Sequence, residues 1–120
     1  MERTELQVAH GRIDVHLAAR AVGGDWLVEI TGGAAHLGAV ALATFHPTHG
    51  RACASVLSAP GHREEQVALD AARAIARHTR TTTVVVAGLH YPEITAEEIA
   101  TARRLCEELV ERFVGELGAA

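Results

Sequence analysis

The sequence contains no lysine, so its 11 basic residues are all arginines, and they are scattered along the chain. Acidic residues outnumber them, which gives a formal net charge of −4. Aromatic residues are also scarce, with one tryptophan, one tyrosine and two phenylalanines. Nucleic-acid binding needs clustered positive charge for the phosphates and aromatic rings on which bases stack. The composition therefore argues against a nucleic-acid-binding protein.

Cysteines and long apolar runs are few or missing. Cys53 and Cys106 lie far apart and form neither a CxxC nor a CxxH pattern. This argues against a disulfide framework and a zinc ribbon, and both thiols are expected to be small core residues. No apolar run approaches the roughly 18 residues of a membrane span. Residues 1–5 are charged, with no signal-peptide core after them, which predicts a cytoplasmic protein without membrane contact.

The length of 120 residues, with 48% hydrophobic and 22% charged residues, predicts one globular domain over residues 1–120. Period-two alternation, a run of β-branched residues and two helical patterns divide the chain into elements. We expect strands at residues 6–10, 13–19, 26–30, 39–45, 51–57 and 81–87, and helices from about residue 63 and from residue 95. The predicted fold is α+β, an antiparallel meander of about six strands with two helices, in the order β-β-β-β-β-α-β-α.

The start of the last helix has the clearest local signal. Thr95 and Glu98 have the spacing of a capping box, in which each side chain bonds the other residue's backbone amide. Ile94 and Ile99 flank it at the spacing of a hydrophobic staple. The loop before this helix, residues 88–93, carries one of the chain's histidines.

Eight histidines are unusual for so short a chain. If successive strands run alternately up and down, the loops carrying His36, His62 and His90 meet at one end of the sheet. His10 falls in a turn at that end, and the others lie at the opposite end or in mid-strand: His46, His49, His78 and His16. Neutral imidazole is a common ligand of divalent metals, so the trio predicts a metal site. The alternative is that these are solvent-exposed loop histidines.

The same end of the sheet has features of a phosphate site. Gly32 and Gly33, in an expected loop over residues 31–38, allow backbone amides to form an anion-binding nest. Residues 60–62 lead into a helix N-terminus, where free amides favour phosphate and Arg63 is placed to pair with it. Glu64 either supports a histidine or is a plain first-turn acid. No nucleophile motif is present, so no catalytic residue is predicted.

These residues also resemble a known family. The matching motifs are Ile30-Thr31-Gly32-Gly33, His36-Leu37-Gly38, Gly61-His62-Arg63-Glu64, Ala87-Gly88-Leu89-His90 and Ile94-Thr95 with Glu98-Ile99. In order and spacing they are similar to the small prenylated-flavin chaperones, the LpdD-like companions of UbiD-type decarboxylases. The resemblance covers about residues 25–110.

The resemblance implies a small homodimer that binds a divalent metal and reduced prenylated FMN and loads this cofactor into an apo-decarboxylase. It matches His36, His62 and His90 to the family's histidines and Gly32, Gly33 and Gly38 to its glycine-rich loop. A UbiD-type decarboxylase and a flavin prenyltransferase are the implied partners. Two alternatives stay open. One is a small metal-dependent hydrolase or decarboxylase subunit that uses metal-bound water. The other is a structural assembly protein whose histidines are incidental.

Overall fold

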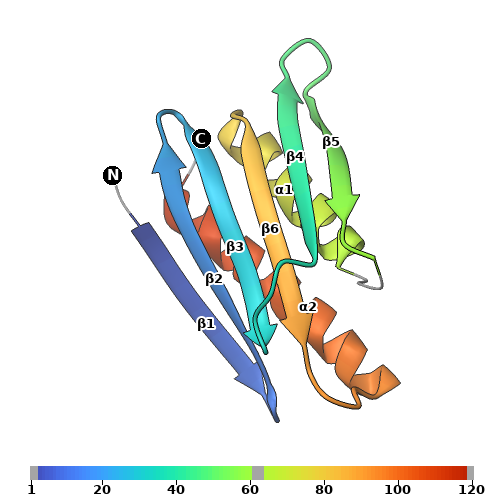
Figure 1. The fold of residues 1–120 in the computed structure, drawn as a ribbon. Coiled ribbons are helices and arrows are strands. Elements are labelled where there is room, and N and C mark those ends of the chain that lie inside the picture. The colour runs from blue at the N-terminus through green and yellow to red at the C-terminus, as the bar shows by residue number, and fades with distance from the viewer. Residues whose placement is uncertain (1–2, 61–63, 119–120) are drawn as a thin grey trace.

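The computed structural model describes residues 3–60 and 64–118. It contains the predicted element order, six strands and two helices (Figure 1). The strands are β1 (Arg3–His10), β2 (Ile13–Val22), β3 (Asp25–Gly33), β4 (Ala39–His46), β5 (Arg51–Ser58) and β6 (Thr83–His90), and the helices are α1 (Glu65–Thr79) and α2 (Ala96–Leu117). Within these ranges, neither helix combines the length and apolar character that crossing a bilayer requires.

The α+β class is confirmed, but the prediction of an antiparallel meander is wrong in one respect. The strand order is β1-β2-β3-β6-β4-β5, and β6 pairs in parallel with β3. The last strand thus enters the middle of the sheet instead of adding to its side. Its run Val84-Val85-Val86 explains this position, because a strand that is apolar on both faces is best buried between two neighbours.

Both helices lie on the same face of the sheet (Figure 1). Helix α1 covers β4, β5 and β6, and α2 covers β1 and β2. Small side chains form the α1 contact and let the helix approach closely, with Ala68, Ala72 and Ala76 on the helix and Ala39, Ala41 and Ala43 on β4 all buried. Larger side chains fill the α2 contact, where Phe113 meets Trp26 edge to face at 5.3 Å between ring centroids.

The opposite face of the sheet has two halves of different character. On β4 and β5 it is apolar, and Val40, Leu42 and Leu57 are 38%, 47% and 80% exposed. On β1, β2 and β3 it is polar, with exposed side chains at Glu5, His16, Arg20 and Glu29. Exposed apolar side chains gathered on one part of a sheet are typical of a protein interface.

At the end of the sheet where the histidines were expected, strands β3 and β6 extend further than the sequence suggests. Residues 31–33 and 88–90 were expected in loops, yet Gly32 pairs with Leu89 and Gly33 with His90 in the β3–β6 ladder. Glycine pairs are typical of loops, but Gly32, Gly33 and Gly88 are strand residues over which other groups pass closely. The capping box of α2 is confirmed, with Thr95 Oγ1 accepting from the Glu98 amide at 3.1 Å.

Candidate functional site

The connection from β3 to β4 has to cross the end of β6, because β6 lies between those two strands (Figure 1). We call residues 34–38 the crossing loop. The Ala34 amide donates to the His90 carbonyl at 2.9 Å, and the Gly38 amide donates to the Ala87 carbonyl at 3.0 Å. The loop is therefore attached to β6 at both of its ends.

Two glycines make this crossing possible. A β-carbon at Gly88 would overlap the carbonyl of His36, and one at Gly33 would overlap the carbonyl of His90. Gly33 also has a positive φ of 62°, a conformation that glycine adopts most readily. The backbone of His36 therefore lies directly on β6.

The crossing loop brings His36 to Glu64, the residue just before α1. His36 Nε2 lies 3.0 Å from Glu64 Oε2, and the Glu64 side chain is 9% exposed. The same oxygen accepts a hydrogen bond from the Leu89 amide at 2.9 Å, beyond the point where β4 stops pairing with β6. A β-carbon at Gly38 would overlap the carboxylate, so this glycine leaves the room that Glu64 occupies.

The two contacts of His36 orient its ring between the crossing loop and Glu64. His36 Nδ1 lies 3.2 Å from the carbonyl of Ala34, which only accepts, so Nδ1 carries the proton in that bond. Nε2, the other ring nitrogen, therefore faces the Glu64 carboxylate.

His90, the last residue of β6, is the second predicted histidine at this end of the sheet. Its ring lies 6.4 Å from the His36 ring, centroid to centroid, at 80° between the planes. The strand directions are those expected, and they bring these two residues together. The predicted His62 and Arg63 lie outside the described residues. In the ranges 3–60 and 64–118, no three His, Cys, Asp or Glu side chains are grouped so as to hold a metal ion.

The glycines predicted to bind the cofactor have structural roles in the described chain. The Gly38 amide donates a hydrogen bond to the Ala87 carbonyl, and the lack of a side chain at Gly33 allows the His90 carbonyl to approach. Gly32 lies under the Tyr91 ring, since a β-carbon there would overlap the phenol oxygen. The Tyr91 hydroxyl donates to the Asp14 carbonyl at 2.6 Å, and burial raises its pKa to about 12. Tyr91 thus fixes the chain directly after His90.

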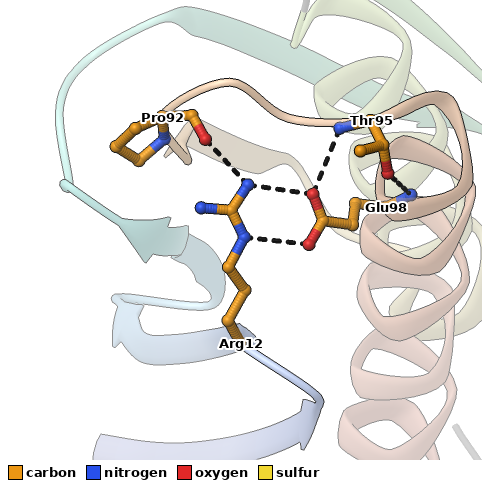
Figure 2. A network of polar contacts seen from close by, with 4 residues as sticks. All are labelled: Arg12, Pro92, Thr95 and Glu98. Carbon is orange, nitrogen blue, oxygen red and sulfur yellow. Dashed lines mark hydrogen bonds and ion pairs between the residues drawn. The ribbon is translucent and has the colours of Figure 1, made fainter.

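Arg12 binds the loop that follows Tyr91 and the start of α2 (Figure 2). Its Nε and Nη2 donate to the two carboxylate oxygens of Glu98 at 2.8 and 2.9 Å, and Nη2 also donates to the Pro92 carbonyl at 2.7 Å. Glu98 therefore serves both in the capping box and in the ion pair. This network joins the β1–β2 turn to the loop between β6 and α2, in which Glu93 has a positive φ of 51°.

A pocket of about 510 Å³ opens beside His90 and Glu64, which belong to its lining. It lies between the start of α1, the segment after β6 and the first turns of α2. The buried thiol of Cys106 is part of its lining. Burial raises the pKa of Cys106 to about 12, so the thiol stays protonated at neutral pH and is a poor nucleophile.

The other histidines have separate surroundings. His46 and His49 lie at the β4–β5 turn, the opposite end of β4 from the crossing loop. His78 bonds the Gly118 carbonyl at 2.7 Å, and His16 lies 3.3 Å from Asp14 on the exposed sheet face. His10 ends β1 and is exposed.

Several site residues had weak or no sequence signals. The sequence alone allows two roles for Glu64, and the structure places this residue against His36. No local sequence pattern points to Tyr91 or Arg12, because their partners Asp14 and Glu98 are 77 and 86 residues away. The capping-box pattern predicts that Glu98 caps the start of α2, but it does not predict the ion pair of Glu98 with Arg12.

Acid titration tests the Arg12–Glu98 pair. The hydrogen bond from Arg12, with help from the Thr95 amide, lowers the pKa of Glu98 from 4.5 to about 2. A carboxylate with a lowered pKa stabilises the fold above its unfolded value, and this stabilisation is lost as the pH falls from 4.5 towards 2. We expect Glu98→Gln to reduce the dependence of the unfolding free energy on pH in that window, measured by urea denaturation at a series of pH values.

The matched control is Glu97→Gln, which removes a carboxylate from the same helical turn but leaves the pair with Arg12. Its pH dependence is expected to follow the wild type more closely than that of Glu98→Gln. Equal curves for the two variants would contradict the role given to Glu98.

Comparison with solved structures supports the fold. A crystal structure of a chaperone complex for yeast 20S proteasome assembly superimposes with a TM-score of 0.69 at 12% sequence identity, covering 98% of this chain and 100% of that chain. At this identity the likeness shows a shared fold alone. A search of curated protein sequences gives no significant match.

The family comparison covers almost the whole chain. The profile of the prenylated flavin chaperone LpdD-like domain matches residues 9–118. That range includes the crossing loop, Glu64, His90 and the Arg12–Glu98 pair, and it confirms the resemblance drawn from the glycine and histidine motifs. The chain belongs to the prenylated flavin chaperone LpdD-like family.

Proposed function

We propose that this protein is a cytoplasmic accessory chaperone that binds reduced prenylated FMN with a divalent metal ion and delivers it to an apo-decarboxylase of the UbiD type. The observation that carries the proposal is the family match over residues 9–118. The grouping of His36, Glu64 and His90 beside a pocket supports it, because it offers polar ligands and an apolar cavity in one place.

The donor chemistry at His36 and Glu64 fits a divalent metal. Imidazole nitrogen and carboxylate oxygen are common ligands of such ions, and these two atoms already lie 3.0 Å apart. The ion would be held by the three ligands that the sequence predicts, His36, His62 and His90, with the Glu64 carboxylate beside His36 as a further oxygen donor. When bound, the metal supplies a positive charge that attracts the phosphate or heteroatoms of the flavin.

The chain's own residues have the remaining tasks. Gly33 and Gly38 keep the crossing loop close to β6, and Gly32 leaves room for the Tyr91 ring. All three remain the glycines that the sequence predicts beside the cofactor. Arg63 remains the predicted phosphate partner, because arginine suits the geometry of phosphate oxygens.

Metal binding is tested first. Purified protein is expected to take up roughly one divalent ion per chain. His36→Ala and His62→Ala are each expected to weaken metal binding by about 10–100-fold or more, because loss of outer-shell partners alone reaches that range. Metal content by elemental analysis and affinity by calorimetry give the measurement.

His49→Ala is the matched control, since this histidine lies at the other end of β4. It is expected to bind metal as the wild type does. Binding that depends on His46 and His49, or that survives unchanged in the His36, His62 and His90 alanine variants, would refute the site.

Cofactor transfer is the second test. We expect the protein to bind reduced prenylated FMN under anaerobic conditions, to release it chemically unchanged, and to activate an apo-decarboxylase. The protonated Cys106 thiol and the lack of a nucleophile motif support a carrier over a catalyst. His90→Ala is expected to abolish activation without unfolding the chain, because His90 is exposed at the end of its strand and contributes little to the core. The readout is decarboxylase activity after mixing.

Two results would overturn this function. Turnover of an aromatic acid by the isolated protein would favour the metal-dependent hydrolase or decarboxylase subunit. Absence of flavin binding together with normal folding would favour a structural assembly role.

We also infer a homodimer that buries the apolar half of the exposed sheet face. A sheet with helices on one face leaves the other face to be covered, and Val40, Leu42 and Leu57 are exposed there. Leu42→Glu is expected to shift the protein to monomers in analytical ultracentrifugation, whereas Arg20→Glu on the polar half is not. A monomeric wild type, or a Leu42→Glu variant that stays dimeric, would contradict this interface.

A further inference from the structure

The pocket beside the histidines has walls from three separate segments. Its apolar side chains come from the start of α1, the end of β6 with the following loop, and the first turns of α2: Val67, Leu89, Ile94, Ile99 and Ala102. Tyr91 and Cys106, both buried, also line it. Ile94 and Ile99 form the predicted staple position of α2, so the residues that fix the start of this helix also form part of the wall.

The pocket has the size and character of a small-molecule site. Its volume of about 510 Å³ falls in the range of about 300–1,000 Å³ that is usual for ligand pockets. Such sites combine mostly apolar walls with a few polar groups. Ile99 is 39% exposed, which leaves apolar surface that a ligand would cover.

The pocket and the histidine group share two residues, Glu64 and His90. A ligand lying in the pocket therefore has its apolar part against α2 and a polar part within reach of the histidines. The cargo in the proposed function has these two parts, a flat ring system enlarged by an apolar prenyl group and a phosphate chain. We propose that this pocket receives the prenylated ring system of the flavin, and that its apolar walls select the prenylated form over plain FMN. This inference rests on the proposed function.

The surroundings of the pocket are suited to hold a ring without reacting with it. The Arg12–Glu98 pair fixes the first turn of α2, and the Tyr91–Asp14 bond fixes the chain beside β6, so both walls are held in place. The thiol in the lining, Cys106, is protonated at neutral pH, which disfavours a covalent bond to the flavin.

The test compares a variant that fills this pocket with a variant that fills a neighbouring groove. Ala102→Phe places a ring inside the pocket, and Ala74→Phe places the same ring in a groove of about 260 Å³ between α1 and α2. Ala102 and Ala74 are both half-buried helix residues. In anaerobic titrations with reduced prenylated FMN, Ala102→Phe is expected to weaken binding at least about 10-fold, and Ala74→Phe to bind as the wild type.

A second variant separates selectivity from blockage. Ile99→Gln leaves the pocket open and makes one wall polar, and it is expected to lower the preference for prenylated over plain reduced FMN. Because Ile99 is partly exposed, this variant is expected to keep the fold even if Ala102→Phe does not. Melting temperatures measured without flavin identify any variant that loses affinity through misfolding.

The outcomes distinguish this proposal from the function on which it rests. If the wild type binds prenylated FMN and both Ala102→Phe and Ile99→Gln bind it equally well, the ring lies elsewhere and only the pocket assignment falls. Equal weakening by Ala74→Phe also overturns the assignment to this pocket. If the folded wild type binds no flavin, the proposed function falls and the pocket assignment falls with it.

Discussion

The crossing of the β3–β4 connection over β6 is the constraint on which the candidate site depends. Because β6 enters the sheet between β3 and β4, residues 34–38 have to pass over its end. A side chain at Gly88 would prevent this, since it would overlap the His36 carbonyl. The crossing places His36 against Glu64, whose carboxylate also accepts a hydrogen bond from the Leu89 amide. The histidine–carboxylate contact is thus a consequence of strand order, and strand order follows from the doubly apolar β6.

A second set of contacts holds the opposite side of the same site. Tyr91 and Arg12 link the segment after β6 to β2 and to the β1–β2 turn, through the Asp14 carbonyl and the Glu98 carboxylate. These bonds act on backbone and helix start, away from His36 and Glu64. The pocket between the two helices therefore has one wall fixed by the sheet and one fixed by polar contacts at the surface. Arg12 does not line the pocket, so a substitution there would affect the pocket only indirectly, through the position of the start of α2.

The sequence was informative where the signal is local. The capping box at Thr95 and Glu98 and the strand alternation each depend on neighbouring residues, and both are found in the structure. The alternation of strand direction is enough to predict that His36 and His90 lie at one end of the sheet, because strand direction follows from counting the turns along the chain. Strand order was not predictable in this way, since period-two patterns do not say which strands pair. Two further features depend on contacts between distant segments: the need for glycine at position 88 under the crossing loop, and the Arg12–Glu98 pair. No local sequence pattern encodes either of them.

The proposed carrier function requires binding and then release of a cargo, and the placement of the candidate site bears on both. His36, Glu64 and His90 lie at the end of the sheet, outside the core formed by α1, α2 and the inner face. Their contacts are polar, and the pocket beside them opens between helix starts. Binding there does not require the core to rearrange, so release does not require the protein to unfold. A site that enclosed the flavin within the core would hold it more tightly and would transfer it more slowly, because affinity differences between related sites lie mostly in the dissociation rate. A candidate site at the end of the sheet, outside the core, is therefore an arrangement that suits the proposed delivery of a cofactor.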